Sequence, residues 1–367
     1  RDLHRHPELS WAEHRTRAQV VAFLEGTGAR WREVAGTGAL AAVGGGGEPS
    51  VLLRVDMDAL PIEEQSDQPY ASQVKGVMHA CGHDGHVAMG AGAARVLAQR
   101  SPRARTLMLF QPAEEGEGGA QAVVADGALE GVRAVFGVHL WNELEVGTLG
   151  VKAGPLMAAV DRLRIVIRGR GGHGGTPHRS ADPVVAAAHV ITALQTVVAR
   201  ETSPLQSAVV TIGSVHGGDA FNVIPDEVTL TGTIRSFDAP LRAAMPERLA
   251  RIAGGVAAAL GCQAEVDVRT GNPAVVNDAG MAALARRAAE RVVGAARVVE
   301  PEPTMGGEDM AVYFERVPGC FVFVGSANPA RGLDQPHHSP RFDFDEDALL
   351  IGTEFLVQVA EEFQNAD

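Results

Sequence analysis

The chain has 367 residues, enough for two or three domains, and its 46% hydrophobic and 21% charged residues are typical of a globular protein. Its 32 basic and 45 acidic side chains give a formal net charge of −13, which repels nucleic acid phosphates and anionic lipid head groups. We therefore expect no nucleic acid and no membrane partner. Three cysteines, Cys81, Cys262 and Cys320, are too few for a disulfide scaffold and favour a cytoplasmic location.

In the first half of the chain, helix-like and strand-like segments alternate. This alternation is typical of helices packed on a mostly parallel, buried sheet. The hydrophobic pattern predicts helices over 13–24 and 86–99 and strands over 50–55, 106–110 and 134–138. The glycine run 44–47 predicts a loop tip or a hairpin.

From about residue 158 the order becomes β-α-β-β-α-β, which is that of a ferredoxin-like split unit. The predicted strands cover 162–168, 208–215, 227–235 and 263–268, and the predicted helices cover 182–200 and 240–260. The apolar stretch 184–199 is interrupted by polar residues and predicts a buried helix. The alternation of the first half then resumes, with a helix over 279–293, a strand over 320–324 and a final helix over 346–362.

We therefore predict an α/β protein whose catalytic domain has a mostly parallel sheet with helices on both faces. Residues 1–157 form the first part of this domain and residues 272–367 the second part. Residues 158–271 form an inserted, smaller ferredoxin-like α+β domain.

Polar side chains gather where strands of the predicted sheet end, which is where open α/β sheets bind ligands. They are Asp56 and Asp58, Glu114 and Glu115, His139, His337 and His338, and the stretch 79–86 at the start of a helix. Imidazole, thiolate and carboxylate groups together are typical ligands of borderline-soft divalent metals. The sequence thus indicates a metal site, although histidines also cap helices.

Several of these residues have a structural alternative. Cys81 can be a small buried hydrophobe, but its place between His79 and His83 in a glycine-containing turn favours ligation. Acidic residues such as Glu114 also favour helix N-termini, yet the glycines at 116, 118 and 119 argue against an immediate helix. His79 and His86 either support ligands or merely begin a helix.

The stretch 169–174 fits the pattern G-x-G-x-x-G after a strand, which keeps a nicotinamide-dependent oxidoreductase open as an alternative. Pro177 and the polar residues up to Ser180 delay the helix that should receive the pyrophosphate. No acidic residue ends a second strand about twenty positions later. We therefore regard this alternative as less favoured.

A set of motifs spread over nearly the whole chain resembles the metal-dependent aminoacylase and carboxypeptidase superfamily. The similarity is to the branch that contains bacterial hippurate hydrolases, N-acyl amino acid amidohydrolases and plant auxin-conjugate hydrolases. The motifs are Leu3-His-Arg-His-Pro-Glu-Leu9, Arg54-Val-Asp-Met-Asp-Ala-Leu-Pro61, Met78-His-Ala-Cys-Gly-His-Asp-Gly-His86, Gln111-Pro-Ala-Glu-Glu-Gly116, Gly169-Arg-Gly-Gly-His173, Asn222-Val-Ile-Pro225, Gly306-Gly-Glu-Asp309 and His338-Ser-Pro340.

The resemblance implies a hydrolase with two divalent metal ions per chain, for which Zn, Mn, Co and Ni all suit the ligands. The implied metal ligands are Cys81, His83, Glu115, His139 and His338. Glu114 matches the general base, which takes a proton from a water activated by the metals and passes it to the leaving amine. Asp58 resembles a carboxylate that orients a ligand imidazole, although a strand-end cap is the alternative. His337 competes with His338, and only the Ser-Pro after His338 separates them.

The resemblance also implies roles for residues of the inserted domain. His173 would stabilise the oxyanion of the tetrahedral intermediate across the interface of a homodimer, although a turn histidine is the alternative. Asn222 and Arg235 match residues that bind the amino-acid part of the substrate, and Arg235 otherwise reads as a solvated strand-end residue.

We accordingly predict a cytoplasmic amidohydrolase that cleaves small N-acyl amino acids, such as N-acetyl or N-benzoyl derivatives, to a carboxylic acid and an amino acid. A small-molecule binding protein of the same fold that has lost its chemistry remains a third alternative.

Overall fold

The computed structural model describes residues 1–45, 49–100, 105–116 and 118–366, which divide into two compact units. Unit 1 comprises Arg1–Leu156, Val276–Glu302 and Asp309–Asp367, and unit 2 comprises Met157–Val275 and Pro303–Glu308. We had assigned the segment Pro303–Glu308 to the catalytic domain, and this assignment is wrong. It belongs to unit 2 because the Ala158 N–H lies 3.1 Å and 2.9 Å from the carbonyl oxygens of Thr304 and Gly306. Residues 46 and 47 of the predicted loop tip lie outside the described residues.

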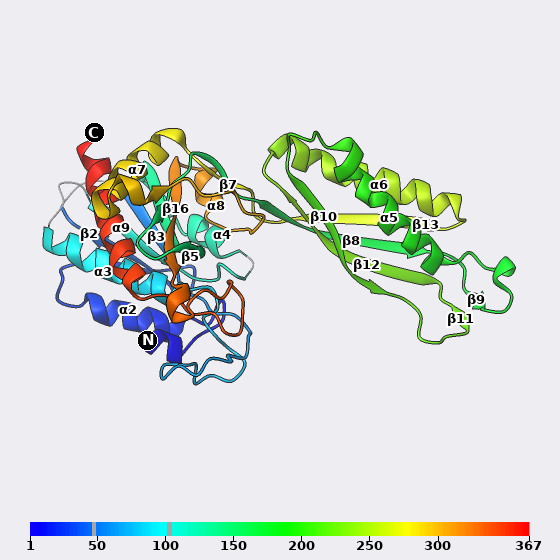
Figure 1. Ribbon diagram of the computed structural model, residues 1–367, viewed down its shortest axis with the longest axis horizontal. Helices are drawn as coiled ribbons and strands as arrows, with labels where there is room; N and C mark the ends of the chain where they lie inside the picture. Colours follow the sequence, from blue (N-terminus) through cyan, green and yellow to red (C-terminus); the bar gives the residue numbers. More distant parts are fainter. Residues whose placement is uncertain (46–48, 101–104, 117, 367) are drawn as a thin grey trace. The chain divides into compact units, whose positions relative to one another are not determined.

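Unit 1 is built on a mixed sheet that is parallel at its centre (Figure 1). Among the described residues its strands follow one another in space as β1 (Arg30–Val34), β2 (Gly38–Val43), β4 (Arg105–Gln111), β3 (Pro49–Asp56), β5 (Ala134–Glu145), β16 (Gly319–Ala327), β6 (Leu149–Gly150) and β15 (Val298–Val299). Strands β4, β3, β5 and β16 run parallel, as predicted, whereas β1 and β2 join antiparallel at the edge. We did not predict β1, whose charged, mostly exposed side chains give no buried-strand pattern.

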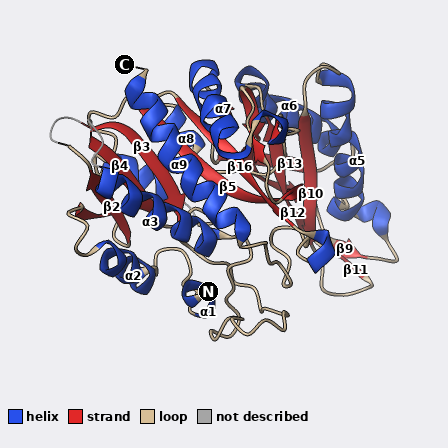
Figure 2. Cartoon of the chain, turned by 60° about the vertical axis from the view of Figure 1, so that its left-hand side comes forward, coloured by secondary structure: helices blue, strands red, loops and turns tan. Residues whose placement is uncertain are grey.

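The helices α3 (His83–Arg100), α7 (Ala279–Val293) and α9 (Asp347–Asn365) pack against one another and against one face of this sheet (Figure 2). Helix α2 (His14–Leu24) packs against α3. All four lie close to their predicted positions. Alternate residues of β3, from Val51 to Val55, join the apolar core under these helices. The opposite face of β3 carries Arg54, and it lies near α8 (Ala311–Phe314).

Arg54 is a fully buried charge in unit 1, and its neighbours compensate it. Its guanidinium nitrogens lie 2.7 Å from Asp56 Oδ2, 2.8 Å from Asp309 Oδ1 and 2.8 Å from Gln111 Oε1. Tyr313 on α8 donates a further hydrogen bond to Gln111. Because every charged partner is hydrogen-bonded, this network is tolerated in the interior and fixes the ends of β3 and β4.

Unit 2 is a four-stranded antiparallel sheet with two helices on one face (Figure 1). Its elements follow the predicted order β8 (Ala159–Arg168), α5 (Pro183–Glu201), β10 (Ala208–His216), β12 (Glu227–Ser236), α6 (Ala239–Ala259) and β13 (Gln263–Thr270). By length and composition alone, α5 could cross a membrane. Its residues Ala187, Val190 and Leu194 lie in the core of unit 2, but Val184 and Val185 are exposed. The predicted buried helix is therefore buried along one side only.

His4, on the short helix α1 (Asp2–Arg5), forms a buried charge pair that makes stability depend on pH. Its ring nitrogens lie 2.9 Å from Asp84 Oδ2 and 3.3 Å from Glu64 Oε1. Burial alone would lower the pKa of His4, but the two carboxylates outweigh it and raise the pKa to about 10. Since this pKa is raised on folding from about 6.5, the stabilisation is complete below pH 6.5 and is lost as the pH rises towards 10.

We therefore expect His4→Gln to lower the free energy of unfolding by about 3 kcal/mol at pH 6. The difference from the wild type should shrink as the pH rises from 6.5 to 10, and chemical denaturation across this range measures it. Substitution of the exposed His189 by Gln is the control and should change neither the free energy of unfolding at pH 6 nor its dependence on pH. A constant difference across the whole range would contradict a charged His4.

Candidate active site

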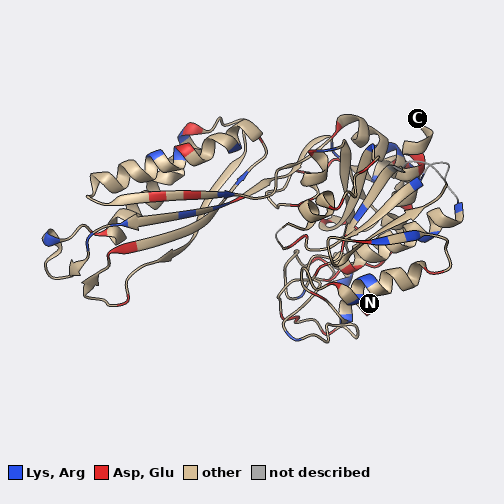
Figure 3. Cartoon of the chain, turned by 180° about the vertical axis from the view of Figure 1, so that it is seen from behind, with Lys and Arg blue, Asp and Glu red and all other residues tan. Residues whose placement is uncertain are grey.

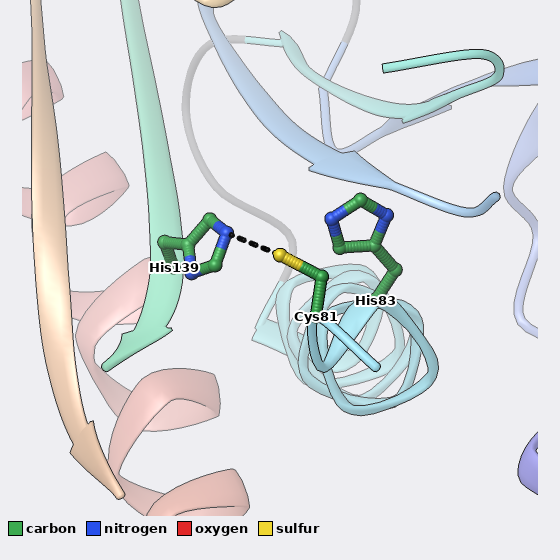
Figure 4. A group of neighbouring side chains, drawn as sticks. All are labelled: Cys81, His83 and His139. Atoms are coloured by element: carbon green, nitrogen blue, oxygen red, sulfur yellow. Dashed lines mark hydrogen bonds between the residues drawn. The ribbon is translucent and has the colours of Figure 1, made fainter. Parts of the chain in front are cut away.

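The carboxyl ends of β3 and β4 bring four acidic residues to one edge of the sheet of unit 1. Asp56 is the last residue of β3, Asp58 follows it, and Glu114 and Glu115 follow β4. His139, in contrast, lies inside β5 rather than after it. Strand β5 is longer than we predicted because its pairing with β16 continues well beyond His139. The His139 side chain points towards Cys81 (Figure 4).

Cys81, His83 and His139 form one group of metal-binding atoms, which all lie within 4.8 Å of one another. Cys81 stands in the turn before α3, and its Sγ is 3.5 Å from Nε2 of His139 (Figure 4). His139 Nδ1 donates to the Leu140 carbonyl at 2.6 Å, and His83 Nδ1 donates to the Asp58 carbonyl at 2.8 Å. Both rings therefore turn their Nε2 lone pairs inwards, and the buried Nε2 of His83 has no hydrogen-bond partner among the described residues.

Two further groups overlap with the first. Donor atoms of Cys81, Glu115 and His338 lie within 4.8 Å of one another, and so do those of His83, Glu114 and Glu115. His338 Nε2 is 3.0 Å from Glu115 Oε1. The structure thus brings all five predicted ligands into one cluster in which Cys81, His83 and Glu115 each belong to two groups. Thiolate, imidazole and carboxylate donors that overlap in this way fit two neighbouring divalent cations.

The electrostatics of the cluster also fit cations. Burial would lower the pKa of His83, but Asp56 and Asp58 raise it to about 10. Burial, Glu115 and Glu114 together raise the pKa of the Cys81 thiol. The His83 shift reports negative charge around a buried group, and at Cys81 the two glutamates add to the effect of burial. A bound divalent cation would compensate this charge and favour the thiolate.

The neighbouring histidines 337 and 338 point to different partners. His338 has a left-handed φ of 65°, its N–H donates to the Ala80 carbonyl, and its ring faces Glu115. His337 Nε2 instead donates to the Leu140 carbonyl at 2.9 Å, and its ring stacks on Trp141. Burial lowers the pKa of His337 to about 4, so this ring is neutral. The structure therefore brings His338, and not His337, to the other predicted ligands.

His86 and His79 lie beside the cluster. His86 Nδ1 donates to Asp56 Oδ1 at 2.6 Å, and its Nε2 accepts the Leu140 N–H at 2.8 Å. Both nitrogens are thus occupied, and His86 links the end of β3 to the middle of β5. His79 is buried before α3, has no hydrogen-bond partner among the described residues, and has its pKa lowered by burial to about 4.

Two buried carboxylates hold the backbone of the Glu114–Glu115 loop. Asp58 accepts the N–H groups of Glu114 and Glu115, each at 3.0 Å. Glu13 accepts the N–H of Ala113 at 2.8 Å and the hydroxyl of Thr37 at 2.6 Å. Asp58 therefore holds the loop after β4, whereas a cap of its own strand end was the structural alternative to its predicted role. Our sequence reasoning missed Glu13, because it stands outside the quoted motifs at the start of α2 and the left-handed Ala113 (φ 54°) was not predicted from the sequence.

The comparison with known families shows which family these residues belong to. Residues 52–362, most of the chain, match the family described as peptidase family M20/M25/M40. This chain belongs to peptidase family M20/M25/M40. The predicted resemblance is confirmed.

Curated M20 relatives cover nearly the whole chain. It is 43% identical over 364 residues to an N-acetyl-L-cysteine deacetylase of Bacillus subtilis, covering 98% of this chain and 86% of that protein. It is 39% identical to an IAA-amino acid hydrolase (ILR1-like 4) of Arabidopsis thaliana, covering 98% of this chain and 83% of that protein. A crystal structure of a dinuclear metal-binding M20 peptidase from Bacillus subtilis is 39% identical, has a TM-score of 0.87, and matches 100% of this chain and 96% of that one.

The M20 chain is therefore a metal-dependent hydrolase, and the alternatives of an oxidoreductase and of a silent binding protein are wrong. The glycine stretch 169–174 does not open a helix. It contains the short strand β9 (Gly172–His173) and is followed by a 3₁₀ turn, Pro177–Arg179, and α5 begins only at Pro183. A dinucleotide-binding turn needs a helix N-terminus directly after the glycines.

The predicted catalytic residue His173 and the predicted substrate-binding residues Asn222 and Arg235 belong to unit 2. His173 is exposed and pairs in β9 with Val223 of β11 (Val223–Ile224), and the Asn222 carbonyl accepts the Gly174 N–H at 2.8 Å. The structure therefore brings His173 and Asn222 together. Arg235 is half-buried on β12, its Nη1 has no hydrogen-bond partner among the described residues, and burial lowers its pKa. The roles of these three residues stay predictions.

If Cys81 binds metal as a thiolate, bound metal should protect it from a thiol reagent. All three cysteines are free and buried, so Cys262 and Cys320 serve as internal references. We expect the metal-free protein to be alkylated at Cys81 at least about tenfold faster than the zinc-loaded protein, measured by mass spectrometry of peptides. Equal rates in both states would place Cys81 outside the metal site.

Proposed function

We propose that this M20 hydrolase cleaves N-acyl amino acids to a carboxylic acid and a free amino acid. The observation that carries the proposal is the overlap of the ligand groups around Cys81 and Glu115 with Glu114 beside them. The names of the deacetylase and of the IAA-amino acid hydrolase support it, since each describes cleavage of an amino acid derivative.

In the proposed mechanism, two divalent ions, Zn, Mn, Co or Ni, held by Cys81, His83, Glu115, His139 and His338 would supply a water of lowered pKa and polarise the amide carbonyl. Glu114 takes the proton of this water on its carboxylate and delivers it to the nitrogen of the leaving amine. The Asp309 N–H, 3.4 Å from Glu114 Oε1, helps to orient the carboxylate. His173 donates a hydrogen bond to the developing oxyanion.

Arg235 and Asn222 bind the amino-acid part of the substrate in this proposal. A guanidinium pairs bidentately with a carboxylate, and the unpartnered Nη1 of Arg235 has a donor to offer. A hydrolysis screen of the metal-loaded enzyme over N-acetyl, N-benzoyl and indole-acetyl amino acids tests the proposal. It should find at least one good free-acid substrate whose methyl ester is about 100-fold poorer.

Arg235→Ala should impose a similar loss on the free acid and little on the ester, because the ester has no carboxylate to hold. Additive effects of the two changes would show that Arg235 does not recognise the carboxylate. The absence of hydrolysis across the whole screen, with metal bound, would contradict the proposed function.

We further propose that the enzyme acts as a homodimer through unit 2. The sheet of unit 2 leaves β10 and β13 as edge strands, to which a second copy can add. Phe221 and Val223, next to Asn222, expose apolar side chains that a partner would cover. In such a dimer, His173 of one subunit would serve the metal cluster of the other.

Mixed dimers test this arrangement. Dimers of His173→Ala chains alone, or of Glu114→Gln chains alone, should be nearly inactive. In an equal, refolded or exchanged mixture about half of the dimers contain one chain of each kind, and one of the two sites in such a dimer is intact. The mixture should therefore regain up to about a quarter of the wild-type activity. His178→Ala, an exposed histidine in the same loop, is the control and should stay active by itself. A monomeric active enzyme in sedimentation would contradict the dimer.

We also propose a cytoplasmic location, for which the support is the set of three free cysteines. Fractionation of the source cells with an antibody against the chain tests it, and recovery in an extracytoplasmic fraction would contradict it.

A further inference from the structure

Three histidine side chains hold the backbone of Leu140 on β5. Among the described residues, β3 pairs with β5 as far as Gly137, and beyond that point β5 continues beside β16. The Leu140 N–H donates to His86 Nε2 at 2.8 Å. The Leu140 carbonyl accepts His139 Nδ1 at 2.6 Å and His337 Nε2 at 2.9 Å, which its two lone pairs allow. Side chains thus bond the backbone of β5 beyond the end of its pairing with β3.

The side chain of His337 connects the loop of one candidate ligand to the strand of another. His337 precedes His338, and the carbonyl that it bonds belongs to Leu140, the residue after His139. His338 and His139 belong to different ligand groups, which have Cys81 in common. The hydrogen bond from His337 to Leu140 therefore constrains the position of one group relative to the other.

Other bonds anchor the same loop next to the cluster. The His338 N–H donates to the Ala80 carbonyl at 2.7 Å, and Ala80 precedes Cys81. Asn142 of β5 donates from Nδ2 to the Gln335 carbonyl at 2.8 Å. The left-handed φ of 65° at His338 is costly for a residue with a Cβ. Such a backbone persists where its surroundings hold it, so the position of His338 depends on these anchors.

Neighbouring rings fix the orientation of the His337 imidazole. It stacks on Trp141 with a centroid distance of 4.9 Å, and Trp141 stacks in turn on Phe323 at 4.1 Å. The ring of Phe342 lies 4.9 Å from that of His337. His337 therefore contributes two separable features, which are a ring among other rings and an N–H donor on the Leu140 carbonyl.

We propose that His337 is a positioning residue, which places the ligand His338 by holding its loop on the strand of His139. The inference rests on the ligand set of the proposed function. The donor of His337 carries the effect, because the donor and not the ring reaches the backbone next to His139. The metal ion that His338 helps to hold should therefore depend on His337. The ion that His139 helps to hold should depend on it much less, because His86 and His139 keep their own bonds to Leu140.

The test titrates the Zn²⁺-loaded protein with a chelator of known affinity and measures the Zn²⁺ that stays bound. His338→Ala identifies the ion that His338 holds. His337→Phe keeps a ring for Trp141 but has no donor, whereas His337→Gln has no ring but offers an amide N–H. We expect His337→Phe to weaken that ion about 10- to 100-fold and the other ion less than about twofold. His337→Gln should weaken it less than about threefold.

Two controls separate positioning from general effects. Gln335→Met leaves the Gln335 carbonyl in place for Asn142 and should bind both ions like the wild type. None of these variants changes a Lys, Arg, Asp or Glu, whose positions in both units Figure 3 shows, so the change in affinity has no origin in the formal charge of these residues. The melting temperature of His337→Phe at saturating Zn²⁺ should stay close to that of the wild type, because its ring still packs on Trp141.

The outcomes separate this inference from the proposed function. Wild-type binding of both ions by His337→Phe would overturn the inference, and so would a His337→Gln variant as weak as His337→Phe. Equal weakening of both ions with a lower melting temperature would also overturn it, since His337 would then only stabilise the fold. If His338→Ala held both ions like the wild type, the ligand set of the proposed function would fail and the inference with it. A failed hydrolysis screen with both ions bound would contradict the proposed substrate class and leave the inference intact, because its readout is metal binding.

Discussion

Glu114→Gln should retain metal and lower kcat by about 10²-fold or more, because the amide cannot take the proton that the reaction must move. The change is nearly isosteric, and the Asp309 N–H can still donate to the remaining side-chain oxygen. KM should change little, since Glu114 acts on the reacting water and not on the groups that bind substrate. Metal content by elemental analysis and steady-state kinetics measure the two effects.

Glu115→Gln should behave differently, although the residue is adjacent. Glu115 belongs to two of the ligand groups, so its substitution should weaken metal binding first and lower activity through loss of metal. Added metal should therefore restore part of the activity of Glu115→Gln and none of that of Glu114→Gln. Glu143→Gln, at an exposed position of β5, is the control. Near-normal turnover of metal-loaded Glu114→Gln would contradict the assignment of the base.

The order of helices and strands could be predicted because most of them carry a clear periodicity. Strand β3 is buried on both faces and reads as an apolar run, and α7 has a clear apolar side. The edge strand β1 could not be predicted, since its exposed and charged residues need only the backbone of β2 as a partner. The segment Pro303–Glu308 could not be assigned either, because its place in unit 2 depends on backbone pairing with Ala158.

The candidate ligands could be named from motifs, but their arrangement could not. The choice between His337 and His338 rested on the two residues that follow, whereas the structure separates the two rings by the left-handed backbone of His338. Left-handed φ values at individual non-glycine residues such as His338 and Ala113 are uncommon, and our sequence reasoning did not predict them. The same limit hid Glu13, whose role depends on the backbone of Ala113 and not on any neighbouring residue.

Glu13 and Asp58 explain how two adjacent glutamates can do different work. Three successive backbone N–H groups, of Ala113, Glu114 and Glu115, are held by these two carboxylates. Fixed peptide planes give each of the two side chains its own direction, which in the proposed mechanism would be towards a metal for Glu115 and towards the water for Glu114. The positioning residues thus act through the loop and touch no reacting atom.

Asp58→Asn should lower kcat/KM by about 10- to 100-fold, because an amide offers one acceptor where the carboxylate serves two N–H groups, and its NH₂ then faces a donor. Metal affinity should fall as well, since the Asp58 carboxylate also lies 3.4 Å from Nδ1 of His83. Glu13→Ala should act similarly and also cost about 2–4 kcal/mol of stability, because it leaves the Ala113 N–H and the Thr37 hydroxyl buried without a partner. Glu13→Gln keeps an oxygen for the Ala113 N–H and should restore most of the activity.

Asp126→Asn, which removes a similar carboxylate clamp on the Ala35 N–H, is the control and should leave metal affinity unchanged. If Asp58→Asn lowered thermal stability but left kcat, KM and metal affinity at wild-type values, the clamp would be structural only.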